Sequence, residues 1–317
     1  MHIEPINLLY CFDKNYNYQA YSSIISFLDQ TDAELNIYII HKNLDDLKDI
    51  PEKILSHKNL KTIEKYQFEK HNNIFPNLEN AHISEATYYR LFISSILPKT
   101  VKNLLYIDCD VICVRTPNKI INETFKALNN SEFTISAKTE FSKDSTSMQH
   151  VFKRLNLKSQ NYFNAGVMFI DLKKWNQKKI HVLSKDIIEN SDLKFTYWDQ
   201  DILNIIFDGH YLHLMDALNY KVSLFKNDNL LDHNNIYFLH FQGSNKPWSV
   251  EGALSLNAYY YQSNFKKLNI DYYHIVHKWK KYSLSVFLLN IIHLIRNKNI
   301  NFVRYTISLL KSLTRSS

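Results

Sequence analysis

The feature that most restricts the possible folds is an apolar run that contains two aspartates. The run reads LLYIDCDVICV from Leu104 to Val114, and Asp108 and Asp110 are its two charged residues. Such a run predicts a buried strand, where two like charges are costly unless a cation neutralises them. In an extended segment, side chains at positions i and i+2 point to the same side. We therefore expect a divalent metal site, although a strand end that exposes both acids to solvent fits the same pattern.

Predicted strands and helices alternate along the chain. Apolar runs predict strands at 6–12, 35–40, 104–107, 111–114, 133–137, 167–170 and 236–239. Apolar residues at helical spacing, with Ser84 as one N-cap, predict helices at 21–28, 44–54, 85–97 and 201–207. Residues 138–160 show little periodicity and predict a long loop with one short helix. The alternation of strands and helices indicates an α/β sheet.

The charge of the chain divides it near residue 271. The net charge is +7, but residues 1–271 carry 30 basic and 31 acidic residues and are close to neutral. No acidic residue follows Asp271, whereas eight basic residues do: Lys278, Lys280, Lys281, Arg296, Lys298, Arg304, Lys311 and Arg315. A nucleic-acid enzyme would carry basic charge across its main groove, so we expect no nucleic-acid partner. We predict a catalytic domain at 1–270 and a basic amphipathic C-terminal helical segment at 271–317.

The ends of the chain and its cysteines predict a cytoplasmic location. The start, MHIEPINLLYCFDKNY, has neither a basic beginning nor a small-residue cleavage site. No stretch reaches the roughly 18–20 apolar residues that cross a bilayer. The chain has three cysteines, an odd number without framework spacing. Cys109 and Cys113 lie in the apolar run, where a reduced buried thiol is expected.

Further polar motifs accompany the aspartate pair in a distinctive order. They are DKNY at 13–16, TYYRL at 87–91, YFNAGV at 162–167, WDQD at 198–201 and HFQGSNKPW at 240–248. Over roughly residues 6 to 250 this ordered set resembles glycosyltransferase family 8. That family includes bacterial lipopolysaccharide and lipooligosaccharide galactosyl- and glucosyltransferases and the glycogenins. The resemblance implies a GT-A fold, with a Rossmann-like central mixed sheet flanked by helices, and retaining transfer of galactose or glucose from a UDP-sugar.

The resemblance also implies which residues hold the metal and the phosphates. Asp108 and Asp110 would be joined by His240 as the third protein ligand to Mn²⁺ or Mg²⁺. A neutral imidazole beside two carboxylates suits a borderline cation such as Mn²⁺. Lys246 would meet the diphosphate as a point charge, and Gly243 would let the backbone approach the phosphates closely. The ordinary structural explanations are a buried histidine, a solvated lysine and a plain turn.

The same resemblance implies how the rest of the donor is bound. The loop after the first strand would receive uracil and ribose, through the backbone of Cys11 and through Asp13, Asn15 and Tyr16. Cys109 belongs to the same donor site, and His82 would lie near both donor and acceptor. The positions that line the donor sugar, where catalytic groups are expected, are Arg90, Asn164, Ala165, Asp199 and Gln200. The ordinary alternatives are a helix-surface arginine at Arg90 and a helix N-cap at Asp199.

Retention at the sugar allows two mechanisms. A double displacement would need a nucleophile, for which Gln200 and Asp199 are the candidates. An amide oxygen is a poor nucleophile, so we favour front-face attack. One departure from the family is Lys138, which stands where members often carry an acid near the acceptor. Two other classes remain open: a non-catalytic protein that binds carbohydrate or nucleotide sugar, and a nucleotidyltransferase, which should have a Gly-rich loop that is absent before Gly166.

The C-terminal segment predicts membrane association. Residues 282–295 are largely apolar but too few to cross a bilayer. Farther on, apolar and polar residues form two faces of a predicted helix, with Ile300, Val303, Ile307 and Leu310 on one and Arg304, Ser308, Lys311 and Arg315 on the other. Such a helix fits an anchor on anionic lipids at the inner face of the cytoplasmic membrane, or it packs on the catalytic domain or a second subunit. Anchoring would favour a lipooligosaccharide, lipopolysaccharide or capsule acceptor.

Overall fold

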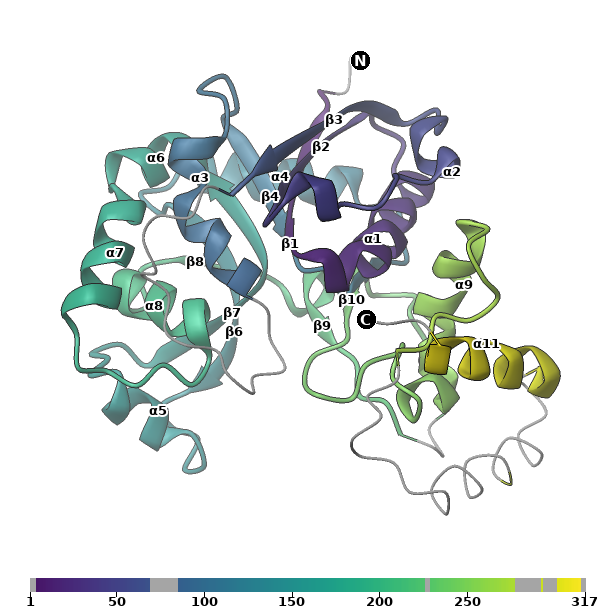
Figure 1. The fold of residues 1–317 in the computed structure, drawn as a ribbon. Helices are drawn as coiled ribbons and strands as arrows, with labels where there is room; N and C mark the ends of the chain where they lie inside the picture. The colour runs from purple at the N-terminus through teal and green to yellow at the C-terminus, as the bar shows by residue number, and fades with distance from the viewer. Residues whose placement is uncertain (1–3, 69–84, 226–228, 277–291, 293–300, 315–317) are drawn as a thin grey trace.

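A seven-stranded mixed sheet forms the centre of the computed structural model, which describes residues 4–68, 85–225, 229–276, 292 and 301–314 (Figure 1). From edge to edge its strands are β3 (Leu60–Gln67), β2 (Leu35–His41), β1 (Ile6–Phe12), β4 (Asn103–Ile107), β7 (Asn161–Asp171), β6 (Ile135–Ser142) and β8 (Leu212–His213). The first four are parallel, and β7 is antiparallel to both β4 and β6. The predicted α/β class is therefore confirmed.

A second sheet has three strands, in the order β5 (Val111–Cys113), β10 (Phe238–His240) and β9 (Tyr220–Lys221). β10 runs antiparallel to β5, and His240 pairs with Val111. This pairing brings the end of β10 beside the turn that carries Asp110, although the two segments are far apart in the sequence. Here the structure moves the predicted strand 236–239 to 238–240 and makes His240 its last residue.

Two apolar cores cover the faces of the large sheet. Alternate residues of β1 face opposite ways: Leu8 and Tyr10 enter one core, and Leu9 and Cys11 enter the other. Such burial on both faces is typical of parallel strands. The first core takes residues from α1 (Asn17–Gln30), α4 (Asn118–Asn129) and α9 (Tyr259–Lys267). The second takes residues from η3 (Glu85–Phe92), α3 (Ile93–Ile96), α6 (Leu172–Gln177), α7 (Ile180–Asn190) and α8 (Trp198–Phe207).

Two predicted helices differ in the structure. The helix expected over 44–54 is interrupted: η2 (Leu44–Asp46) ends early, and α2 (Glu52–Leu55) starts after Pro51. Proline lacks a backbone N–H and fixes its own φ, so it begins a helix and does not continue one. The helix expected over 85–97 is the 3₁₀ segment η3 followed by α3. Its predicted N-cap, Ser84, lies outside the described residues.

The predicted loop at 138–160 is shorter than expected. β6 continues to Ser142, β7 begins at Asn161, and α5 (Gln149–Arg154) is the short helix between them. The register between these strands shifts: Ala137 pairs with Met168, but Lys138 pairs with Asn164. Residues 165–167 of β7 therefore bulge away from β6. Bulges redirect side chains beside functional sites, and this one lies in the YFNAGV motif.

Lys174 holds the loop that follows α4. Its Nζ donates to the carbonyl oxygens of Leu128, Ser131 and Phe133 at 2.8, 2.8 and 3.1 Å. Lys174→Met would keep the length of the stem and leave these carbonyls without their charged donor. We expect the free energy of unfolding in urea to fall by about 2–3 kcal/mol. Lys173→Met, at an exposed neighbour, should change it by less than about 0.5 kcal/mol; equal losses would refute this role.

The last described helix, α11 (Phe302–Thr314), packs on the protein through a face that the sequence did not predict. Tyr305 and Leu309 are buried against Val250, Leu254 and neighbouring residues. The Tyr305 hydroxyl donates to the Val250 carbonyl oxygen at 2.7 Å. The other described elements are η1 (Lys14–Tyr16), η4 (Asp216–Leu218), η5 (Gly252–Leu254) and η6 (Leu256–Ala258). Among the described residues no helix is long and apolar enough to cross a membrane, and 282–295 lie outside them apart from residue 292.

Candidate metal and donor site

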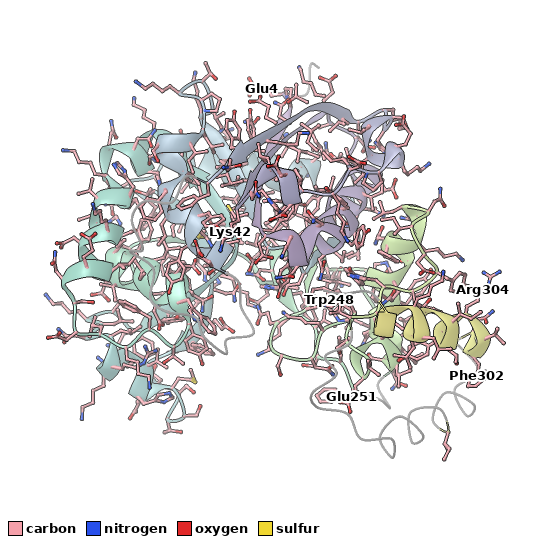
Figure 2. The ribbon with its side chains drawn as sticks, viewed as in Figure 1. Glu4, Lys42, Trp248, Glu251, Phe302 and Arg304 are labelled. Carbon is pink, nitrogen blue, oxygen red and sulfur yellow. The ribbon has the colours of Figure 1, made fainter. Side chains whose placement is uncertain are left out.

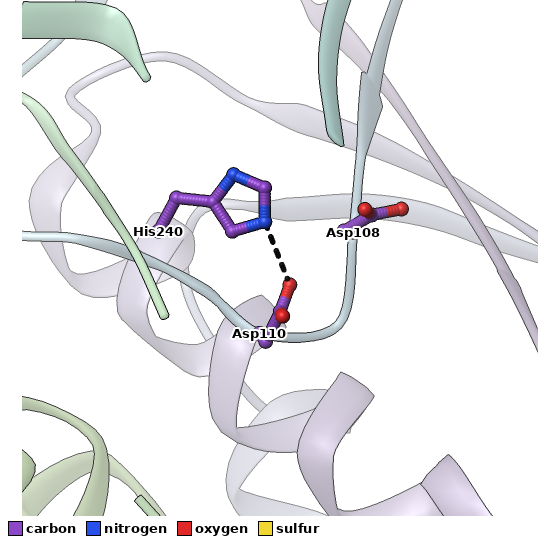
Figure 3. A group of neighbouring side chains, drawn as sticks. All are labelled: Asp108, Asp110 and His240. Atoms are coloured by element: carbon purple, nitrogen blue, oxygen red, sulfur yellow. Dashed lines mark ion pairs between the residues drawn. The ribbon is translucent and has the colours of Figure 1, made fainter. Parts of the chain in front are cut away.

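Three predicted metal ligands converge where β4 and β10 end. Asp108 and Asp110 lie in the turn between β4 and β5, not in the extended segment that the sequence suggested. The turn nevertheless places both carboxylates close to His240, and Figure 3 shows the Asp110 carboxylate pointing at the ring. One ligand atom from each of the three residues lies within 4.8 Å of the other two. The His240 Nε2 atom is 3.2 Å from Oδ1 of Asp110.

These residues fit a divalent cation. Two carboxylates and an imidazole are a suitable donor set for Mn²⁺ or Mg²⁺. Asp110 Oδ1 is buried and makes no hydrogen bond of acceptable geometry, so an oxygen lone pair is left for a ligand. In the part of the chain that the structure describes, this is the one cluster of three or more such side chains that converges.

Gly166 provides the room in which the three ligands meet. A Cβ atom at this position would lie 2.3 Å from Cε1 of His240 and 2.8 Å from Oδ2 of Asp108. The Gly166 carbonyl oxygen also accepts a hydrogen bond from the Asp108 backbone nitrogen at 2.8 Å. β7 therefore forms the floor of the site, and a side chain there would displace a ligand. Gly166 was part of a recognised motif, but the sequence alone assigned it no role.

A positive charge lies beside the acids. Nζ of Lys246 is 2.5 Å from Oδ2 of Asp110 and 2.7 Å from the carbonyl oxygen of Phe241. Burial by itself raises the pKa of the Asp110 carboxyl, but Lys246 and His240 outweigh it and hold that pKa well below its usual range. Asp110 is therefore ionised and ready to bind a cation. Lys246, the predicted diphosphate contact, lies directly next to the metal ligands.

Arg90 is buried and is not a helix-surface arginine. Its Nε lies 2.7 Å from Oδ2 of Asp199, and its Nη1 lies 3.2 Å from Oδ1 of Asp108. The same Nη1 donates to the Ala165 carbonyl oxygen at 2.6 Å. Burial raises the pKa of Asp199 to about 7, although Arg90 opposes the rise. Arg90 thus ties together the metal-binding turn, the β7 bulge and the start of α8. Asp199 pairs with it in the first turn of that helix and does not cap it.

Gln200 and Asn164 lie side by side above the bulge. Gln200 Oε1 accepts a hydrogen bond from the Ala165 backbone nitrogen at 3.0 Å. Asn164 Nδ2 donates to Glu140 Oε2 at 3.0 Å, and Gln200 Nε2 is 3.5 Å from the same oxygen. The structure therefore brings together the four residues predicted to line the donor sugar next to Arg90: Asn164, Ala165, Asp199 and Gln200.

Glu140 is a residue that the sequence interpretation missed. The Nζ of Lys138 contacts Asp216 at 3.4 Å and the Asn219 carbonyl oxygen at 3.2 Å. The acid that faces Asn164 and Gln200 comes two residues later on the same strand. The departure noted at Lys138 therefore does not leave this edge of the site without an acid. The register between β6 and β7 shifts again between Thr139 and Phe141, so simple strand alternation does not select Glu140.

The predicted nucleotide loop lies at the carboxyl end of β1, next to β4. Asp13 Oδ1 accepts from the Asn15 backbone nitrogen at 2.9 Å and begins η1. The Tyr16 ring packs edge-on against Trp248, with centroids 6.2 Å apart. Cys11 is buried, which raises its thiol pKa, so a backbone contact suits it better than thiolate chemistry.

For three further predicted positions, the described part of the chain shows no contact that assigns a role. Gly243 has φ +87°, and a Cβ there would meet no atom within 4 Å, so its backbone borders open space. Cys109 is buried between the two acids, and burial raises the pKa of its thiol well above the usual value. His82 lies outside the described residues. The binding roles of all these residues remain predictions.

Comparison with known proteins identifies the family. The sequence model of the protein family described as glycosyl transferase family 8 matches residues 7–252. Lipopolysaccharide 1,2-glucosyltransferase of Escherichia coli K12 is 31% identical over 177 residues. This match covers 52% of this chain and 49% of that protein, about half of each. General stress protein A of Bacillus subtilis 168 is 28% identical over 265 residues, covering 78% of this chain and 88% of that protein.

A solved structure shows the same fold. The crystal structure of the galactosyltransferase LgtC with donor and acceptor sugar analogs matches with a TM-score of 0.64 at 18% identity. The match covers 82% of this chain and 95% of that chain, and it confirms the expected GT-A fold. Because the family model covers most of the sequence and the fold agrees, the chain belongs to glycosyltransferase family 8.

Proposed function

We propose that this protein is a metal-dependent, retaining glycosyltransferase that moves galactose or glucose from a UDP-sugar to a cell-surface glycan. The observation that carries the proposal is the convergence of Asp108, Asp110 and His240 beside Lys246. Family membership supports glycosyl transfer. The names of the relatives support a hexose, since one is a glucosyltransferase acting on lipopolysaccharide and another a galactosyltransferase.

The residues of the site suit a diphosphate leaving group. Mn²⁺ or Mg²⁺, when bound by the three ligands, would withdraw charge from the diphosphate oxygens. The Lys246 ammonium would add a second positive charge at the same place, since it already lies against Asp110. The loop that contains Gly243 offers backbone close to open space, where phosphate oxygens have access to it. Asp13, Asn15 and Tyr16 would hold the uridine at the end of β1.

The hydrogen bonds of the site favour front-face attack. Gln200 Oε1 already accepts from Ala165, and Asp199 already pairs with Arg90. A nucleophile for double displacement would have to leave one of these contacts. In front-face attack the acceptor oxygen bonds to the anomeric carbon as the bond to the phosphate oxygen breaks, and the departing phosphate takes the acceptor proton. Glu140, beside Asn164 and Gln200, would contact an acceptor hydroxyl.

A panel of UDP-sugars tests this function. We expect UDP release from UDP-galactose or UDP-glucose only when Mn²⁺ or Mg²⁺ is added, and transfer to a lipooligosaccharide-type acceptor. Binding of UDP-sugar without any turnover would support a carbohydrate-binding protein of the same fold. Release of pyrophosphate from UTP and a sugar phosphate would indicate a nucleotidyltransferase. Either result would refute the proposal.

We also propose that the catalytic domain at 1–270 is held at an anionic membrane surface by the segment 271–317. α11 docks with Tyr305 and Leu309, which leaves the predicted apolar face outward: Val303, Ile307 and Leu310 are 62%, 47% and 51% exposed. Arg304 and Phe302 lie at the outer end of the same helix (Figure 2). Exposed apolar residues on a segment with eight basic and, after Asp271, no acidic side chains suit anionic lipid. This would place the enzyme on the cytoplasmic face, near lipid-linked acceptors.

A double variant on the exposed face tests the membrane proposal. Ile307→Glu with Leu310→Glu should lower sedimentation with phosphatidylglycerol vesicles by at least about tenfold, because two apolar contacts are lost and two negative charges added. Turnover of a water-soluble acceptor should persist. Val182→Glu, at an exposed valine of α7, is the control and should bind vesicles as before. Unchanged vesicle binding by the double variant would refute the proposal. So would a dimeric parent protein that the double variant converts to a monomer, because the exposed face would then pack on a second subunit.

A further inference from the structure

Asn219 connects the donor-sugar residues to the metal-binding histidine. It is fully buried and follows η4, in a segment that no sequence motif marked. Its Oδ1 lies 2.8 Å from Nδ1 of His240, and its Nδ2 donates to Asn164 Oδ1 at 2.9 Å. The side-chain amide of Asn219 therefore contacts both a residue predicted to line the donor sugar and a predicted metal ligand.

The direction of these hydrogen bonds is fixed by groups whose roles are unambiguous. The Gly166 backbone N–H can only donate, and it donates to Asn164 Oδ1 at 2.9 Å. The Glu140 carboxylate accepts from Asn164 Nδ2 at 3.0 Å on the other side of the same amide. Both contacts require the oxygen of Asn164 to face Asn219. Asn219 must then present its NH₂ to Asn164 and its oxygen to His240.

An oxygen opposite Nδ1 requires that nitrogen to carry the proton. In the neutral imidazole the remaining nitrogen, Nε2, is then unprotonated, and it is the atom that faces Asp110 at 3.2 Å. A metal ligand must be an unprotonated nitrogen, so this tautomer is the one that binds a cation. In the structure the Gln242 amide points its Nε2 at Nδ1 at 3.1 Å and leaves its Oε1 buried and unpaired, so a protonated Nδ1 requires this amide to be turned, which also brings the oxygen beside a donor.

We infer that Asn219 is a positioning residue that sets the tautomer of His240 and so prepares it for the divalent cation. The effect on metal affinity rests on the proposed function, which supplies the cation. The effect on the tautomer does not, because the contact between Asn219 and Nδ1 is present in the metal-free protein. It also couples the two halves of the site, because Asn164 both faces the predicted sugar position and orients Asn219. A change at Asn219 should therefore act on metal affinity even though the residue does not touch the metal.

Two variants separate this role from a merely structural one. Asn219→Leu removes the acceptor, so the ¹⁵N shifts of the His240 ring in metal-free protein should show a mixture of tautomers. Its Mn²⁺ affinity, measured by calorimetry, should fall by about 10–100-fold. Asn219→Asp keeps an acceptor opposite Nδ1, so it should retain the Nδ1–H tautomer and an affinity within about threefold of the parent, the ordinary scatter for a preserved contact.

Asn204→Leu is the matched control. Asn204 is also buried. Its side-chain amide accepts from the Phe163 backbone nitrogen and donates to the Phe163 carbonyl oxygen on β7, but no hydrogen bond joins it to His240. It should lose stability and keep the tautomer. The inference is overturned if Asn219→Leu keeps the parent's ring shifts, or if Asn219→Asp loses affinity as severely as leucine does. Failure of the parent protein to bind Mn²⁺, with the Nδ1–H tautomer intact, would refute the metal proposal and leave this one standing.

Discussion

Asp110→Asn is expected to lower kcat/KM for the UDP-sugar by at least about 10³-fold, corresponding to several kcal/mol of lost charge stabilisation. The change keeps the size of the side chain and removes its charge. Oδ1 faces the metal-ligand nitrogen of His240, and Oδ2 faces the ammonium of Lys246 at 2.5 Å, so one substitution affects both the metal site and its neighbouring positive charge. UDP release should be measured at saturating Mn²⁺, so that weaker metal binding alone does not explain the loss.

Thermal unfolding gives a second measure of the same variant. Mn²⁺ with UDP should stabilise the parent by about 2.7 kcal/mol at a hundredfold excess over Kd and should leave Asp110→Asn unchanged. Asp208→Asn is the control, since Asp208 accepts backbone hydrogen bonds from Lys158 and Ser159 away from the site. It should lose stability and keep turnover. Parent-like turnover by Asp110→Asn would refute the metal site and the proposed chemistry with it.

Gly166→Ala is expected to lower Mn²⁺ affinity by at least about 100-fold without changing any ligand. The added Cβ would lie 2.3 Å from His240 Cε1, a distance that real Cβ atoms essentially never show. The backbone of β7 cannot retreat easily, because Asp108 donates to the Gly166 carbonyl oxygen and Gly166 donates to Asn164. His240 or Asp108 must therefore leave the position in which it meets the other ligands.

Gly209→Ala is the matched control for this substitution. Gly209 has φ +82°, and a Cβ there would lie 2.5 Å from Cβ of Ser159, remote from the ligands. Both alanine variants should therefore unfold at lower denaturant concentration than the parent. Only Gly166→Ala should lose Mn²⁺ binding in calorimetry. Comparable Mn²⁺ affinity for the two variants would show that the floor of the site tolerates a side chain, contrary to the packing described above.

The parts of the fold that the sequence predicted well are those whose burial is uniform. β1, β2 and β4 are buried on both faces, so their apolar runs stand out and their predicted limits agree with the structure to within one residue. β3 was missed because it is an edge strand whose residues, LKTIEKYQ, are mostly half-exposed or exposed. The helix over 44–54 was wrong because apolar spacing was counted across Pro51, where the backbone cannot remain helical.

The candidate site was predictable where a residue type is unusual for its surroundings. Two acids in an apolar run indicated a cation, and the ordered motifs supplied His240 and Lys246. Glu140 was missed because a bulge between β6 and β7 decides which residue of the strand faces the site. Asn219 has no sequence signal at all, since an asparagine after a short 3₁₀ turn is ordinary and its partners come from three distant segments.

The sequence by itself determined the α/β class and the pair of acids in an apolar run, and it predicted a basic helical segment near the C-terminal end. These conclusions depend on patterns of apolar and charged residues, and such patterns are visible within a short stretch of sequence. Only the tertiary structure decided that Gly166 lies under the ligands, that Asn219 faces Nδ1 of His240, and which face of α11 docks. Each of these depends on atoms contributed by segments far apart in the chain, and hydrogen-bond direction and steric contact exist only once those atoms are placed.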